Sequence, residues 1–214
     1  MPRAPFAILY GNGPSLTLKP AQPLRLSTMT WDFPERPDLI TLAERDARLD
    51  FLRDHLKSLC GLWDKTPRWF LDAYFRDIHK SILRNRHDLE ALAAVHGGLF
   101  RPEDWAYSAL CPLPQARLPA VPDTVVDVAF WSGAELYAVF VLGTTSQNRA
   151  QREDRARIRE SGVHVIEIPG AELQRASAGD PMARLPAALG KFWEGVSLPS
   201  SPFRIGSLDE IVSA

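Results

Sequence analysis

The spacing of apolar residues predicts helices between residues 37 and 110. Five leucines, with charged residues between them, recur at heptad-like spacing: Leu42, Leu49, Leu52, Leu56 and Leu59. A second helix is expected to open at Thr66-Pro67, a capping residue followed by a first-turn proline. A third runs over about 88–95 and stops at Gly97-Gly98, and 102–110 forms a short fourth. The leucine stripe is too short to indicate a coiled coil, so we expect it to face the core rather than a dimer partner.

Residues 1–36 are rich in proline and turn-forming residues and contain three short apolar runs. These runs, at 6–10, 15–18 and 24–30, predict short strands. Such short strands need a surface to pack on. Two roles stay open for this segment: it covers the core, or it projects as an arm to a partner.

Residues 111–195 have the strand and helix pattern of an α/β unit. Two apolar runs, 125–131 and 136–143, flank Ser132-Gly133 and predict a hairpin with a two-residue turn. That turn would place Asp127 opposite Ala138, with Phe140 and Leu142 on the same face. A helix up to about residue 161 and a strand at 163–168, parallel to the second hairpin strand, are expected next. A last helix is predicted at 181–193, and 196–214 reads as a tail.

Composition excludes several classes of protein. The chain has 214 residues, 45% of them hydrophobic, which suffices for a substantial core. A net charge of −1 gives no global attraction to nucleic acid, so such a surface would have to be local. Two cysteines and five scattered histidines form no disulfide framework or metal motif. The short N-terminal apolar run and the lack of any long one predict a soluble cytoplasmic protein with no membrane partner.

The hairpin resembles part of the PD-(D/E)XK, or restriction-endonuclease-like, nuclease superfamily. Pro122-Asp123 and Asp127 lie on its first strand, and Ala138-Val-Phe-Val-Leu-Gly143 stands where similar endonucleases show Ala-Val-Glu-X-Asp-Gly. The resemblance covers roughly residues 87–195. It implies an α/β fold, with a mixed sheet and a restriction-endonuclease-like core at 111–195. A short β-rich segment at 1–36 and a helical region at 37–110 precede that core, and a tail at 196–214 follows it.

Two residues depart from the pattern at the positions that carry nuclease chemistry. Metal-dependent hydrolysis of a phosphodiester needs several oxygen ligands for Mg²⁺ and a group that positions water. Phe140 and Leu142 supply neither. The sequence therefore predicts a catalytically degenerate protein without a cofactor, which acts by binding nucleic acid or a protein partner. Restoring the pattern with Phe140→Glu and Leu142→Lys is expected to create affinity for Mn²⁺.

Two alternatives stay open. One is an active Mg²⁺- or Mn²⁺-dependent nuclease whose ligands have migrated; its candidate catalytic residues are Asp127, Glu103, Glu167 and Gln151, with Arg152 as an alternative to Gln151, and Asp127 is the candidate metal ligand. The other is a structural or assembly subunit, including a homodimer, that uses the fold as a scaffold. For contacts with a nucleic-acid backbone the candidates are Arg76, Lys80, Arg84, Arg149 and Arg152, against the simpler interpretation of solvated helix surfaces.

Overall fold

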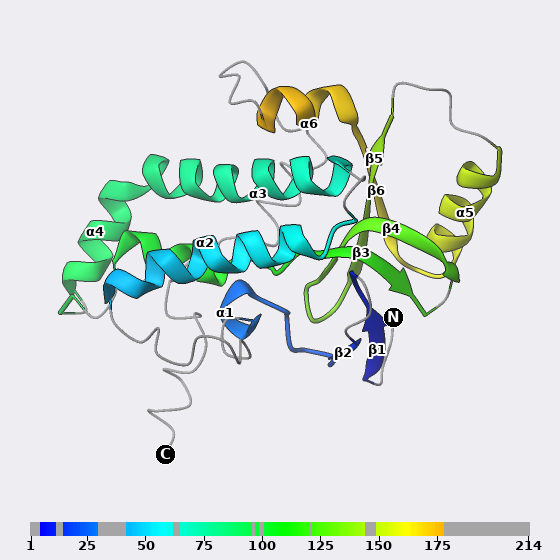
Figure 1. Cartoon of the computed structure of the whole chain (residues 1–214). Helices are drawn as coiled ribbons and strands as arrows, with labels where there is room; N and C mark the ends of the chain where they lie inside the picture. The colour runs from blue at the N-terminus through cyan, green and yellow to red at the C-terminus, as the bar shows by residue number, and fades with distance from the viewer. Residues whose placement is uncertain are drawn as a thin grey trace.

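Six strands form one mixed sheet at the centre of the molecule. The computed structural model describes residues 5–11, 15–29, 42–61, 65–95, 97–98, 101–119, 121–143 and 149–177. The strands follow the order β2-β1-β3-β4-β5-β6 (Figure 1). Their bounds are β1 Phe6–Leu9, β2 Ser15–Leu18, β3 Leu113–Leu118, β4 Val121–Trp131, β5 Leu136–Leu142 and β6 His164–Pro169. Neighbours are antiparallel except β5 and β6, which are parallel. The expected α/β class with a mixed sheet is confirmed.

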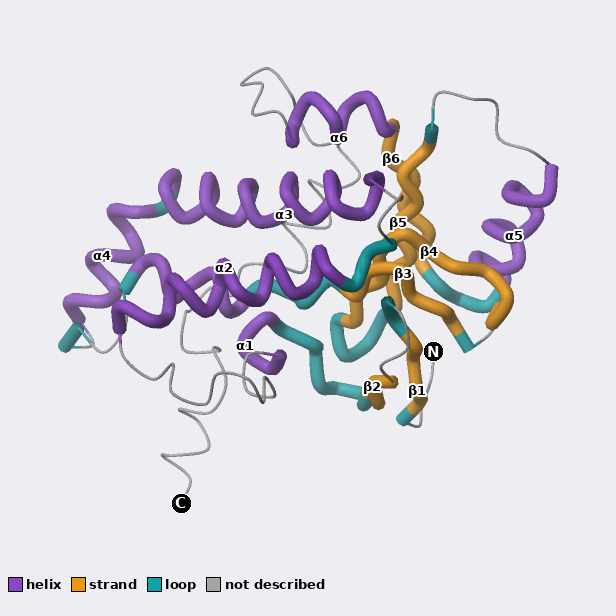
Figure 2. Tube along the Cα trace, in the orientation of Figure 1, coloured by secondary structure: helices purple, strands orange, loops and turns teal. Residues whose placement is uncertain are grey.

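Helices lie on both sides of the sheet. The bounds are α1 Leu26–Met29, α2 Leu42–Ser58, α3 Lys65–Arg84, α4 Arg86–Val95, the 3₁₀ helix η1 Pro102–Ser108, α5 Arg149–Glu160 and α6 Gly170–Ser177. Helix α5 lies on one side of the sheet, whereas α2, α3, α4 and α6 lie on the other (Figures 1 and 2). Within the described ranges, no helix combines the length and the apolar character needed to cross a membrane.

Helix α3 carries the largest part of the core on its side of the sheet. Alternate residues of β4 point to opposite faces, and Phe130 points toward α3. Its ring lies 5.9 Å from that of Phe70 and 5.3 Å from that of Tyr74, between centroids. The Tyr74 hydroxyl donates to the Leu110 carbonyl at 2.5 Å, so this buried aromatic side chain keeps a polar partner.

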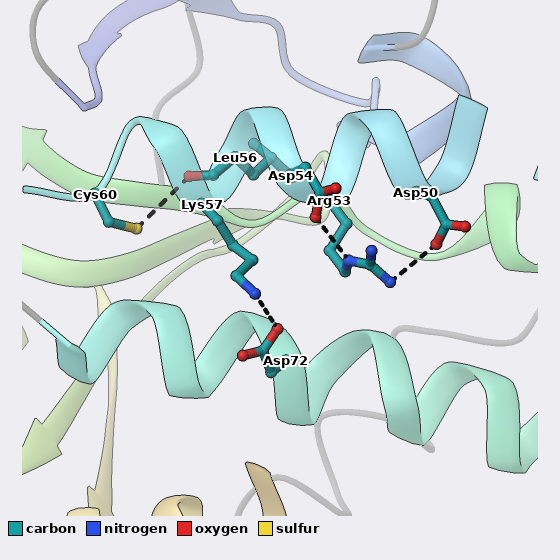
Figure 3. Close-up of polar contacts among 7 residues, drawn as sticks. All are labelled: Asp50, Arg53, Asp54, Leu56, Lys57, Cys60 and Asp72. Carbon is teal, nitrogen blue, oxygen red and sulfur yellow. Dashed lines mark hydrogen bonds and ion pairs between the residues drawn. The ribbon is translucent and has the colours of Figure 1, made fainter. Parts of the chain in front are cut away.

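Helix α2 packs beside α3, and the leucine stripe faces the core as predicted. Leu52 and Leu56 are fully buried, while the side chain of Leu42 lies outside the described residues. An ion pair joins the two helices, with Lys57 Nζ 2.6 Å from Asp72 Oδ1 (Figure 3). Both side chains of this pair are about one third exposed, so its contribution to stability is small beside that of the leucines.

The described part of the N-terminal segment, residues 5–11 and 15–29, packs on the core and does not project as an arm. Strands β1 and β2 form as predicted, and β1 joins the main sheet where Leu9 pairs with Arg117. Ile8 and Leu18 are buried in the same core cluster as the helices and the hairpin. The predicted strand at 24–30 is wrong. Arg25 forms one isolated bridge with Leu110, and the chain then turns into α1.

The hairpin forms, but its turn is longer than predicted. Strands β4 and β5 are antiparallel neighbours, and β6 is parallel to β5, as expected. The predicted two-residue turn is wrong, because residues 132–135 form the loop. The Ser132 amide donates to the Glu135 carbonyl at 3.0 Å, and the Ser132 hydroxyl accepts from the Glu135 amide at 2.9 Å. Gly133 has φ +89°, which favours glycine. These side-chain bonds favour the wider loop over a tight turn.

Three further expectations have mixed outcomes. The helices predicted between 65 and 110 are present, although a turn at Asn85 separates α3 from α4. The proline-rich stretch from Cys111 to Pro119, for which no strand was predicted, contains β3, which links the N-terminal strands to the hairpin. The predicted helix at 181–193 and the tail at 196–214 lie outside the described residues.

Candidate functional site

Three residues on adjacent strands form a row across the face of the sheet that α5 covers. Ala129 pairs with Ala138, and Val128 with Val139, so Asp127 does not lie opposite Ala138 as predicted. Extending this register by one pair places Asp127 opposite Phe140. The difference is two residues, which preserves the face. Phe140 in turn pairs with Glu167 on β6. The row is therefore Asp127, Phe140 and Glu167, with the phenylalanine in the middle.

Asp127 binds the backbone of the neighbouring strand. Its Oδ2 accepts a hydrogen bond from the Val141 amide at 2.6 Å. Regular pairing of β4 with β5 ends at Val128 and Val139, so this carboxylate satisfies an amide beyond the paired residues. The bond gives Asp127 a structural role, whether or not it has a chemical one.

Glu167 is held by two arginines of α5. Its Oε1 lies 3.1 Å from Arg155 Nε and 2.6 Å from a terminal nitrogen of Arg159. A carboxylate that shares a sheet face with valines needs such partners. The two arginines differ in burial: the Arg155 side chain is 6% exposed, whereas that of Arg159 is 51% exposed.

Arg155 also lies over the middle residue of the row. Its guanidinium carbon is 5.7 Å from the centroid of the Phe140 ring, within the range of a cation–π contact. Helix α5 positions it through a face made of Gln151, Asp154, Arg155 and Ile158, at the spacing of successive turns. Ile158 is fully buried and anchors that face.

A cavity of about 440 Å³ opens beside the row, between β4, β5 and the start of α5. Its lining includes four residues that sequence reasoning had selected, Asp127, Phe140, Leu142 and Gln151. It also includes Asp123, Asp154 and Arg155. Sequence reasoning passed over Asp154 and Arg155 because α5 reads as a solvated helix; their spacing from Ile158 was the available signal. The acidic residues outnumber the basic one, so the cavity does not attract phosphate.

Glu103 lies away from the row. It belongs to η1, and its Oε1 is 3.2 Å from a terminal nitrogen of Arg86 on α4, a helix on the side of the sheet opposite α5. Asp127 and Glu167 share a face, but two interstrand spacings, roughly 10 Å, separate their backbones. Glu103, Asp127 and Glu167 are therefore not brought together, and only Gln151 joins Asp127 at the cavity.

The residues of the row do not fit a divalent metal ion. Mg²⁺ requires several oxygen ligands at about 2.1 Å in octahedral geometry. The middle position offers an aromatic ring, a guanidinium covers it, and the oxygen of Glu167 is engaged by two arginines. Among the described residues, no cluster of three or more His, Cys, Asp or Glu side chains is arranged to bind a metal.

The candidate basic residues lie on two opposite sides of the sheet. Arg76, Lys80 and Arg84 belong to α3, whereas Arg149 and Arg152 belong to α5. They therefore do not form one surface. Lys80 and Arg84 are exposed, as is Arg152. The side chain of Arg149 lies outside the described residues.

The α3 group is partly neutralised. Burial raises the pKa of the Asp77 carboxyl, and the nearby charges of Arg84 and Lys80 oppose that rise. Arg86, two residues after Arg84, begins α4, where its Nε lies 2.8 Å from Glu90 Oε1. Of the three candidate cations on α3, Lys80 and Arg84 are exposed and Arg76 is half-buried.

Comparison of the chain with family models, with curated proteins and with solved structures finds no match.

Proposed function

We propose that this chain is a catalytically degenerate protein with a PD-(D/E)XK-like core, and that it acts by binding rather than by cleavage. The order of the elements supports this proposal. An antiparallel hairpin with an acid on its first strand is followed by a helix and by a strand parallel to the second hairpin strand. This is the order that the resemblance implies.

One observation supports the proposed lack of catalytic activity. Phe140 occupies the middle of the row between Asp127 and Glu167, and the buried Arg155 lies over its ring. A nuclease would need an oxygen ligand there and an open path for a water-bearing ion. In this chain the apolar side chain of Phe140 and the buried guanidinium of Arg155 occupy that position. Hydrolysis of a phosphodiester by a bound metal has no support at such a site.

Nucleic acid, if it is the partner, is proposed to bind on the α3 side. The cavity beside α5 is lined by three aspartates and one arginine, and that arginine already pairs with Glu167. A phosphate backbone would be repelled there. Lys80 and Arg84 are exposed and one turn apart on α3, so they lie at suitable spacing for adjacent phosphates.

The experiment compares matched charge variants on the two sides. Binding of labelled single- and double-stranded DNA and RNA is followed by fluorescence anisotropy at several salt concentrations. Lys80→Gln with Arg84→Gln is expected to weaken binding and, for duplex DNA, to reduce the salt slope by about 2, at about 0.9 per lost phosphate contact. Arg152→Gln, on α5, is the control and should leave both unchanged.

Each alternative predicts a different result. Equal binding by the wild type and the Lys80/Arg84 variant would place the surface elsewhere and contradict the α3 proposal. A wild-type protein that binds none of the probes would favour a protein partner or an assembly role. Metal-dependent cleavage of a probe, abolished by Asp127→Ala, would establish the migrated-ligand nuclease instead.

A further inference from the structure

A buried arginine on the face that α5 covers pairs with Glu167 and lines the same cavity as Asp127. We propose that Arg155 is an internal counter-ion, and that it occupies the position which a divalent cation would need between β4 and β6. The inference rests on the proposed function in one respect, namely that the wild-type face holds no metal. Beyond that function, it identifies Arg155 as the residue that prevents a metal ion from binding on this face. It also identifies the substitutions at positions 140 and 155 that would allow binding.

The geometry places one positive charge at the centre of the row. The Arg155 guanidinium lies above the ring of Phe140, at 5.7 Å from carbon to centroid, and its Nε is 3.1 Å from Glu167 Oε1. Asp127 lies on the other flank of Phe140 and lines the same cavity as Arg155. The side chain of Arg155 is 6% exposed, so the charge is fixed by packing rather than free to move into solvent.

A guanidinium and a divalent ion compete for the same oxygens. Both are cations that bind carboxylates, and a guanidinium does so through directed, charge-assisted hydrogen bonds. A carboxylate introduced at position 140 would lie directly beneath the guanidinium of Arg155. It would pair with that arginine first, because the partner is already in place and no water has to be removed from a metal ion.

The sequence predicts that Phe140→Glu with Leu142→Lys creates affinity for Mn²⁺. If Arg155 is the internal counter-ion, that pair of substitutions is not enough. Phe140→Glu creates three carboxylates in a row, but Arg155 and Arg159 remain to neutralise them. Replacing the buried Arg155 by an uncharged residue frees the oxygens at the centre of the row. Arg159 is half exposed, so a bound ion can displace it from Glu167 into solvent. The lack of a metal site on this face therefore depends on two residues, Phe140 and Arg155, rather than on Phe140 alone.

The test uses the full chain and measures Mn²⁺ binding by calorimetry in five proteins: wild type, Phe140→Glu, Arg155→Met, Phe140→Glu with Arg155→Met, and Phe140→Glu with Arg155→Lys. Only the combination of Phe140→Glu with Arg155→Met is expected to bind. Its Tm should rise by roughly 5–10 °C when Mn²⁺ is present at a hundred times the Kd. Phe140→Glu with Arg155→Lys keeps the positive charge but changes the shape of the side chain. It should bind no Mn²⁺, which would show that the charge of Arg155, and not its shape, excludes the ion.

Each remaining result has a defined meaning. Binding by Phe140→Glu alone, as tight as in the double variant, would overturn the role of Arg155. Binding by the wild type would contradict the proposed function, so the two failures are distinguishable. If Phe140→Glu with Arg155→Met does not fold without metal, its circular dichroism is followed on adding Mn²⁺. Recovery of structure supports the proposal. Absence of both structure and binding, there and in Phe140→Asp with Arg155→Met, contradicts it.

Discussion

The ion pair between Arg155 and Glu167 is expected to be asymmetric, because its two partners are buried to different extents. The side chain of Arg155 is 6% exposed and that of Glu167 is 33% exposed. Removing one partner of a fully buried pair costs about 3–5 kcal/mol, since the other charge is left without compensation. Removing the glutamate leaves the more deeply buried charge. The two substitutions should therefore differ in effect.

The structure sets the magnitudes. Glu167→Gln leaves the Arg155 guanidinium buried, with its Phe140 contact and a neutral amide beside it, so we expect a loss of about 2–3 kcal/mol. Arg155→Met leaves Glu167 partly solvated and still 2.6 Å from Arg159. The methionine preserves most of the packing, and the lost cation–π contact is worth about 0.5–1 kcal/mol. We expect a total of about 1–2 kcal/mol for Arg155→Met.

Urea denaturation at pH 7 measures these losses, and Arg159→Met is the control. Arg159 binds the same carboxylate but is half exposed, so its replacement should cost less than about 1 kcal/mol. The expected order of destabilisation is Glu167→Gln, then Arg155→Met, then Arg159→Met. An Arg155→Met variant that loses as much as Glu167→Gln would refute the reasoning from burial, as would an Arg159→Met variant that loses more than either.

Three other outcomes can be checked separately. Gly133→Ala should lower Tm by several degrees, because an added Cβ would meet backbone atoms at 3.0–3.2 Å; Gly162→Ala has open space and a similar φ, so it isolates the backbone term and should cost less. Burial raises the pKa of Asp77, so its contribution to stability is present below pH 4 and lost as pH rises; Asp77→Asn should raise Tm at pH 7, with an advantage that disappears near pH 3. Cys60 and Cys111 are buried and burial raises the pKa of the Cys111 thiol, so both should react with a thiol reagent only on unfolding; fast reaction of the native protein would show that this part of the core opens.

The elements with strong periodicity could be predicted from sequence. The leucine stripe of α2, the apolar face of α3 and the alternating strands of the hairpin depend on local patterns that burial reinforces. Strand β3 could not be predicted in the same way. Pro114 within it and the flanking Pro112 and Pro119 do not indicate a strand. Its pairing with β1 joins Leu9 to Arg117, more than a hundred residues apart in the chain.

The candidate site was predictable in part for the same reason. Asp127 and Phe140 stay on one face when the register changes by an even number of residues, as it does here. The hairpin pattern was therefore sufficient to predict that they share a face. The role of Arg155 was not visible, because an arginine-rich helix normally faces solvent. Only the packing of Ile158 onto the sheet turns Arg155 inward, and the arginine then meets Glu167 across the connection from α5 to β6.

Incubation of the wild-type protein with nucleic acid and metal tests the central claim most directly. Single- and double-stranded DNA and RNA are incubated with the protein in Mg²⁺ and in Mn²⁺, beside Asp127→Ala, and the products are resolved on denaturing gels. We expect no cleavage above background with either metal, because Phe140 and Arg155 occupy the centre of the row. Cleavage by the wild type that disappears in Asp127→Ala would contradict it.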